Sequence, residues 1–108
     1  MRMTLKAIKN NKGATLNNNG EAVSYKRGFQ VSSKDLFVCS VSALRMRDIK
    51  VILAQLSDSE NLGIWISDGC AFVDVSEHIA NRAHALKVGR DRKQISVYAW
   101  AKGEAVYC

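Results

Sequence analysis

Apolar and polar residues alternate most regularly between residues 62 and 75, on either side of Asp68-Gly69. Asp-Gly is a strong signal for a two-residue hairpin turn, so this stretch predicts two antiparallel strands. The pairs expected on one face are Ile66–Ala71, Ile64–Val73 and Leu62–Val75, and those on the other face are Trp65–Phe72 and Gly63–Asp74. Because a slip by one residue would mix the two faces, the pattern fixes the register.

A second hairpin is predicted at the C-terminus, around Lys102-Gly103, with strands over residues 95–100 and 104–108. One face of this hairpin carries Val97, Ala99, Val106 and Cys108, and the other carries Ser96, Tyr98, Trp100, Ala105 and Tyr107. Both hairpins therefore have an aliphatic face and an aromatic face. We expect helices to cover the aliphatic faces, because apolar side chains there must be removed from water.

Two stretches have the apolar spacing of helices. The first runs from about residue 43 to 56, and Ser42 is its expected N-cap. The second runs over residues 82–92 and has Asn81 as its expected cap. Basic side chains lie mainly on the polar side of the first helix.

The N-terminal third gives a less definite pattern. A short strand is expected over residues 36–41, and an Asn19-Gly20 turn predicts a hairpin before it. That hairpin would place Leu16 beside Val23 and Ala14 beside Tyr25. Together the elements predict one α+β domain over residues 1–108, with a mostly antiparallel sheet built from hairpins and two helices packed on one face.

The 108-residue length and the cysteines narrow the class of protein. A chain of this length favours a single domain. Three cysteines, Cys39, Cys70 and Cys108, are far apart and form no Cys-x-x-Cys pair, so neither a disulfide framework nor a zinc knuckle is expected. No stretch resembles a signal peptide or a membrane span, and we therefore expect a cytoplasmic protein without membrane contact.

Charge is unevenly distributed along the chain. The net charge is +6; residues 1–50 carry ten Lys or Arg against three acids, and residues 82–108 carry six against two. Residues 51–81 carry five acids and no Lys or Arg. Basic flanks favour an anionic partner such as nucleic acid or an acidic protein face, although the same charge would also serve solubility.

Two basic groups are candidates for contact with such a partner. Arg90, Arg92 and Lys93 are expected near a helix C-terminus, and Lys26 and Arg27 precede a glycine. Each group also has an explanation without a partner. The helix dipole favours cations such as those of the first group near a helix C-terminus, and the second group can belong to a solvated loop. Gly-x-x-x-x-Gly-Lys and Gly-x-Gly-x-x-Gly fingerprints are both absent, so no nucleotide cofactor is expected.

The aromatic face provides a further candidate site. Trp65, Phe72, Tyr98 and Trp100 could stack on nucleobases if they are exposed. The alternative is a second core in which the N-terminal segment covers these rings. The sequence leaves this choice open, because it lacks the aromatic motif of ribonucleoprotein domains.

The run Asp74-Val-Ser-Glu-His78 carries the most reactive side chains. On one strand Asp74, Ser76 and His78 point to the same side, but residues two apart rarely form the geometry of a hydrolase triad. Ser76 could instead be a cap or turn residue. His78, His84 and Asp74 match no compact metal site, so we expect no bound metal.

Three stretches of the C-terminal half, residues 62–76, 85–90 and 94–100, resemble small uncharacterised proteins of bacteriophages and prophages. This resemblance implies a small accessory gene of a mobile element, and such genes often encode inhibitors of host defences, including anti-CRISPR proteins. It carries no catalytic motif across. Many anti-CRISPR proteins are acidic mimics of DNA, whereas this chain is basic.

Three functions follow as expectations. The first is a non-enzymatic phage-type protein that inhibits a bacterial defence nucleoprotein, such as a CRISPR effector, by basic surface contacts in the host cytoplasm. The second is an accessory protein that binds nucleic acid directly. The third is a small enzyme around Asp74, Ser76 and His78. An unpaired edge of the last strand would also allow a homodimer, which the sequence does not decide.

Overall fold

The computed structural model describes residues 2–108, which form one six-stranded antiparallel sheet and three α-helices. The elements in chain order are α1 (Leu5–Asn10), β1 (Gly13–Leu16), β2 (Phe29–Ser40), a 3₁₀ turn (Val41–Ala43), α2 (Met46–Leu53), β3 (Asn61–Ser67), β4 (Cys70–Ile79), α3 (Arg82–Asp91), β5 (Ser96–Ala99) and β6 (Glu104–Tyr107). The predicted α+β class is confirmed. The expected number of helices is wrong, because the short α1 has too few residues to show helical periodicity.

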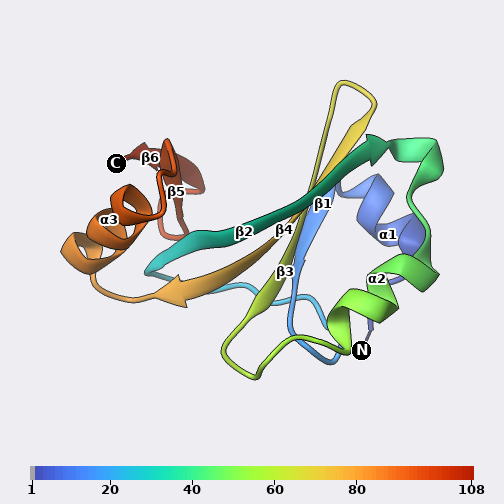
Figure 1. Cartoon of the computed structure of the whole chain (residues 1–108), viewed down its shortest axis with the longest axis horizontal. Helices are drawn as coiled ribbons and strands as arrows, with labels where there is room; N and C mark the ends of the chain where they lie inside the picture. Colours follow the sequence, from blue (N-terminus) through green and yellow to red (C-terminus); the bar gives the residue numbers. More distant parts are fainter. Residues whose placement is uncertain (1) are drawn as a thin grey trace.

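The strands lie in the order β1-β3-β4-β2-β5-β6. The long strands β2 and β4 connect two ends of the molecule, with α1 and α2 at one end and α3 with the β5–β6 hairpin at the other (Figure 1). The short strand expected at residues 36–41 forms the end of the longer β2, which has 12 residues. Polar residues and two irregularities in its pairing with β4 hide the strand pattern in the sequence.

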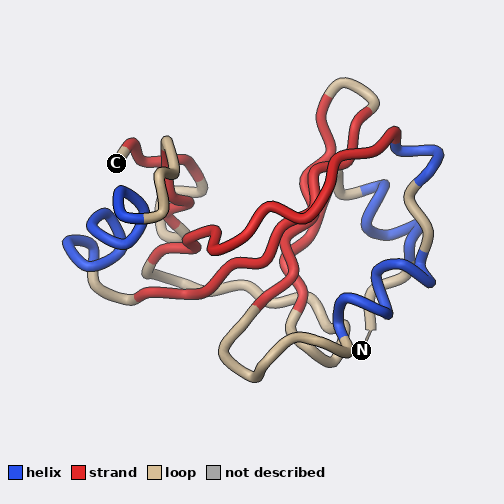
Figure 2. The backbone as a smooth tube through the Cα atoms, viewed as in Figure 1, coloured by secondary structure: helices blue, strands red, loops and turns tan. Residues whose placement is uncertain are grey.

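The helices lie at two ends of the sheet, α1 and α2 at one and α3 at the other (Figure 2). Two clusters of buried side chains lie on the aliphatic side of the sheet, one at each of these ends. The first, beside α1 and α2, contains Ile8, Leu16, Leu44, Ile49, Leu62, Ile64, Ala71 and Val73. The second, beside α3, contains Val31, Ile79, Ala85 and Val97. The expected covering of the aliphatic face by helices is therefore confirmed.

The β3–β4 hairpin has the predicted register. Ile64 pairs with Val73, and Trp65 pairs with Phe72 on the opposite face. The turn residues Asp68 and Gly69 have φ angles of 51° and 76°, as a type I′ turn requires. The C-terminal hairpin likewise turns after Ala99; its Val97 belongs to the second cluster, and Val106 and Cys108 pack against it.

The N-terminal hairpin was predicted wrongly. The turn at residues 17–20 forms, but Leu16 makes an isolated bridge to Ala22 rather than pairing with Val23, and no second strand follows. Instead β1 pairs with β3, where Leu16 lies opposite Leu62. Burial of Leu16 in the first cluster outweighs the local preference for continuing the hairpin.

The first helix was expected over residues 43–56, but α2 spans Met46–Leu53, so the predicted helix is too long at both ends. Ser42 lies inside the 3₁₀ turn and is not a helix cap; α2 follows Arg45, whose side chain makes no capping bond. The reason is Leu44, which is extended and buried in the first cluster and so interrupts the helix. The cap predicted at Asn81 is confirmed, since its Oδ1 accepts from His84 N at 2.9 Å.

Candidate binding groove

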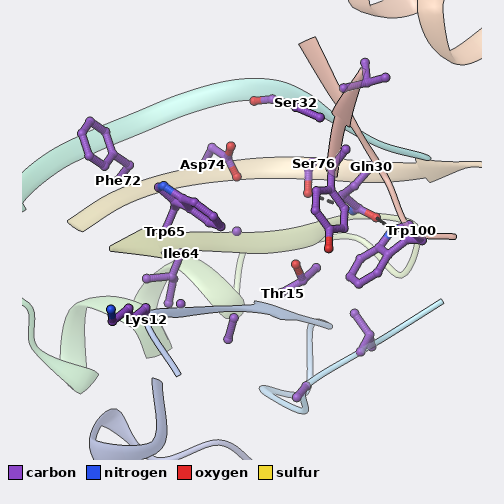
Figure 3. A pocket seen from close by; sticks show the side chains of 18 of the residues that line it. Lys12, Thr15, Gln30, Ser32, Ile64, Trp65, Phe72, Asp74, Ser76 and Trp100 are labelled. Atoms are coloured by element: carbon purple, nitrogen blue, oxygen red, sulfur yellow. Dashed lines mark hydrogen bonds between the residues drawn. The ribbon is translucent and has the colours of Figure 1, made fainter. Parts of the chain in front are cut away.

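The aromatic face of the sheet is hollowed into an open groove of about 590 Å³ (Figure 3). Strands β3, β4 and β2 provide its floor, and the turn before β1 and the β5–β6 hairpin contribute on opposite sides. Gly63 keeps the floor open, because a Cβ atom at this position would lie 2.1 Å from Asp74 Oδ1. A pocket of this size is typical of ligand sites.

Four aromatic side chains lie along this groove, and three of them are exposed to solvent. The exposed fractions are 64% for Trp65, 44% for Phe72 and 37% for Tyr98, whereas Trp100 is half-buried. Trp65 and Phe72 lie on one side of Asp74, and Trp100 lies on the other (Figure 3). The choice that the sequence left open is thus decided: the rings do not form a second core.

A buried hydrogen-bond network positions Trp100. Gln30 Nε2 donates to Asn61 Oδ1 at 2.8 Å and to Ser76 Oγ at 2.9 Å. Trp100 Nε1 in turn donates to Gln30 Oε1 at 3.1 Å (Figure 3). Gln30, Asn61 and Ser76 are all buried, so these bonds satisfy polar groups that water does not reach. The Trp100 and Tyr98 rings also meet at nearly a right angle, with centroids 5.0 Å apart.

Asp74 places a carboxylate in the floor between the aromatic pairs. Burial raises its pKa to about 6, and the neighbouring carboxylate of Asp35 adds to the rise, while a hydrogen bond from Ser32 opposes it. Asp35 lies directly opposite Asp74 in the β2–β4 pairing. Within residues 2–108 no salt bridge to Asp74 is formed. A carboxylate that is costly to ionise in a groove is a candidate for function.

Ser76 and His78 do not extend this site into a catalytic triad. Ser76 lies within β4 and accepts from Gln30, so the interpretation as a cap or turn residue is wrong. His78 stacks on Tyr25 with ring centroids 3.9 Å apart, and its Nε2 lies 2.9 Å from the Arg27 carbonyl oxygen. The hydrogen-bond chain that a triad needs is therefore not formed.

The structure divides the five predicted basic residues between the two faces. Lys26 and Arg27 are exposed beside Gly28, whose carbonyl oxygen accepts from Trp100 N, so they lie near one end of the groove. Lys93 is exposed and directly precedes Gln94, which lines the groove.

The other two of these residues lie with α3 on the aliphatic side. Arg92 forms an ion pair with Glu77 of β4, and Arg90 belongs to the last turn of α3.

Two further residues, Lys12 and Gln30, were not placed in the groove from the sequence. Lys12 lines it at the end nearest Trp65, and its carbonyl oxygen accepts from Ile66 N. Lys12 has a φ of 58° and lies in a turn. The glycine that follows it is the turn signal that the sequence offers. Gln30 stands between Phe29 and Val31, and a polar residue inside an apolar run is the signal that was available for it.

None of the described helices is long and apolar enough to cross a membrane. Within residues 2–108 no three His, Cys, Asp or Glu side chains converge as metal ligands. No protein-family model matches the chain, and neither the curated proteins nor the solved structures contain a significant match to it.

Proposed function

We propose that this chain is a non-enzymatic binding protein that takes up single-stranded nucleic acid in the aromatic groove. The observation that carries the proposal is the exposure of Trp65, Phe72 and Tyr98 in one groove with Trp100. Bases stack on such rings whatever their sequence, and each stack contributes about 1–3 kcal/mol. A duplex fits the groove less well, because its bases are already stacked on one another.

Cations near both ends of the groove support this choice of ligand. Lys12 lines one end, and Lys26 and Arg27 directly precede Gly28, whose carbonyl oxygen accepts from Trp100 N at the other end. Cations placed in this way can contact phosphates while the bases lie on the rings between them. The net charge of +6 also favours association with a polyanion.

The test is fluorescence anisotropy of labelled single-stranded and duplex oligonucleotides of about ten nucleotides, a length within the range bound by one small domain. We expect binding to the single strand and at least about tenfold weaker binding to the duplex. Trp65→Ala should weaken single-strand binding by about 5- to 100-fold. Val51→Ala is the matched control, since Val51 is 59% exposed but lies on α2 outside the groove.

Salt provides an independent readout of the phosphate contacts. Affinity should fall as salt is added, and the slope should become shallower by about one unit for each contacting cation replaced by Ala. Lys12→Ala, Lys26→Ala and Arg27→Ala are the variants for this measurement. Absence of binding to every single strand would refute the proposed function.

The second candidate function is inhibition of a bacterial defence nucleoprotein by basic surface contacts. One observation favours it: Lys26, Arg27, Arg90 and Lys93 are exposed and form no salt bridge within residues 2–108. Immobilised chain would then retain a purified CRISPR effector while free oligonucleotides are not retained. Retention that persists when these four residues are replaced by Ala would exclude this candidate.

A further inference from the structure

Stacking of bases on the aromatic rings gives no role to the carboxylate of Asp74 in the groove. It lies in the floor between two aromatic groups, where bases would be held (Figure 3). A phosphate would be repelled by it, so it does not serve the backbone of a nucleic acid. Gly63 on the neighbouring strand leaves room for it, because a Cβ atom there would collide with Oδ1 in its present position.

The acceptor capacity of Asp74 is largely unused. A hydrogen bond from Ser32 lowers its pKa, and no salt bridge within the described chain involves it. An ionised carboxylate can accept at about four positions and can take two parallel N–H donors at once. At neutral pH it remains mostly ionised, since its pKa is about 6. The groove therefore offers an open, planar pair of acceptors between ring walls.

A planar partner with two adjacent N–H donors fits this arrangement. Among the nucleobases, guanine presents its N1–H and N2–H₂ side by side on the edge that is exposed when the base is unpaired. Adenine and uracil or thymine lack such a pair of donors. We propose that Asp74 makes the groove selective for guanine, an inference that rests on the proposed function. The base would stack on Trp65 or Trp100 and direct its Watson–Crick edge at the carboxylate.

The experiment compares single strands that differ at one base. Labelled thymine oligonucleotides of about ten nucleotides carry one central guanine, hypoxanthine, adenine or cytosine, and affinities are measured by anisotropy at about pH 7.5, well above the pKa of Asp74. We expect the guanine strand to bind about 5- to 100-fold more tightly than the adenine strand. The hypoxanthine strand should fall between them, because it keeps N1–H and lacks the amino group.

Asp74→Asn is the variant that tests the assignment. It keeps the size of the side chain but replaces one acceptor with a donor, so the ratio of guanine to adenine affinity should fall to within about twofold. Asp68→Asn is the matched control: it removes the same charge in an exposed turn, where Asn-Gly also suits the positive φ angles, and should keep the ratio. Cooperative unfolding of each variant confirms that it is folded.

The outcomes separate the two proposals. Equal affinity for all four strands, or a guanine preference that survives Asp74→Asn, overturns guanine selectivity and leaves the stacking function standing. Absence of binding to any strand overturns both. Binding of an arginine-containing peptide with no nucleic-acid binding also overturns both, because a guanidinium offers the same pair of donors to a carboxylate.

Discussion

The two faces of the sheet have the same strands but opposite environments. On the aliphatic face, Leu62 and Ile64 of β3 are almost fully buried beneath helices. On the other face of the same strand, Trp65 is 64% exposed. A large ring held in water has a cost, because burying such a side chain is worth about 2–3 kcal/mol. The difference indicates that one face maintains the fold and the other is available for binding.

Polar groups differ between the faces in the same way. The aliphatic face keeps its charges at the margin, where Arg92 pairs with Glu77 beside α3. The groove instead contains a costly carboxylate, Asp74, and a buried amide, Gln30, within its floor. Proteins accept such local costs mainly where function needs them.

The sharpest test of this division compares neighbouring residues of β3. Leu62→Ala removes a fully buried side chain and should lower the free energy of unfolding by about 2–5 kcal/mol. Trp65→Ala should change it by no more than about 0.5 kcal/mol, because Trp65 is mostly exposed. Urea denaturation measures both values. A large loss from Trp65→Ala would show that the aromatic face also stabilises the fold.

The next effect concerns the amide network under the groove. Gln30→Ala leaves Asn61, Ser76 and the Trp100 indole N–H without their partner, which should cost about 1–3 kcal/mol. It should also change the near-UV circular dichroism of Trp100. Gln55→Ala is the control, because Gln55 is exposed after α2 and should be neutral. Equal stability of the two variants would mean that the network contributes nothing.

The smallest effect depends on pH. Because the pKa of Asp74 is raised from 3.8 in the unfolded chain to about 6 in the fold, its ionisation lowers stability progressively between these values and by a constant amount above them. Asp74→Asn should therefore stabilise the protein at pH 7 by about 1–2 kcal/mol, allowing for the partial exposure of the carboxylate.

The pH dependence of the stabilisation by Asp74→Asn provides the control. The advantage of Asp74→Asn over the unsubstituted protein should disappear below about pH 3.8, where the carboxyl group is protonated in both states. Unfolding followed from acidic to neutral pH measures the difference. A gain that is the same at every pH would contradict the raised pKa.

Local pattern and turn chemistry were enough to predict both well-formed hairpins. Asp68-Gly69 and the alternation around it determine the register of β3 and β4 and separate Trp65 from Leu62. The cap of α3 at Asn81 is equally local. The site was predicted in part: its four rings were expected on one face, whereas Gln30 and Lys12 were not recognised because their roles come from distant strands.

The sequence by itself therefore determined which side chains share a face, because the alternation of a strand is a property of the chain. Only the tertiary structure decided that β1 pairs with β3, that Leu44 interrupts the first helix and that Trp65, Phe72 and Tyr98 stay exposed. These outcomes depend on contacts between residues far apart in the chain, where burial of apolar side chains outweighs local preference. The separation of a covered face from an open one is thus a property of the whole fold.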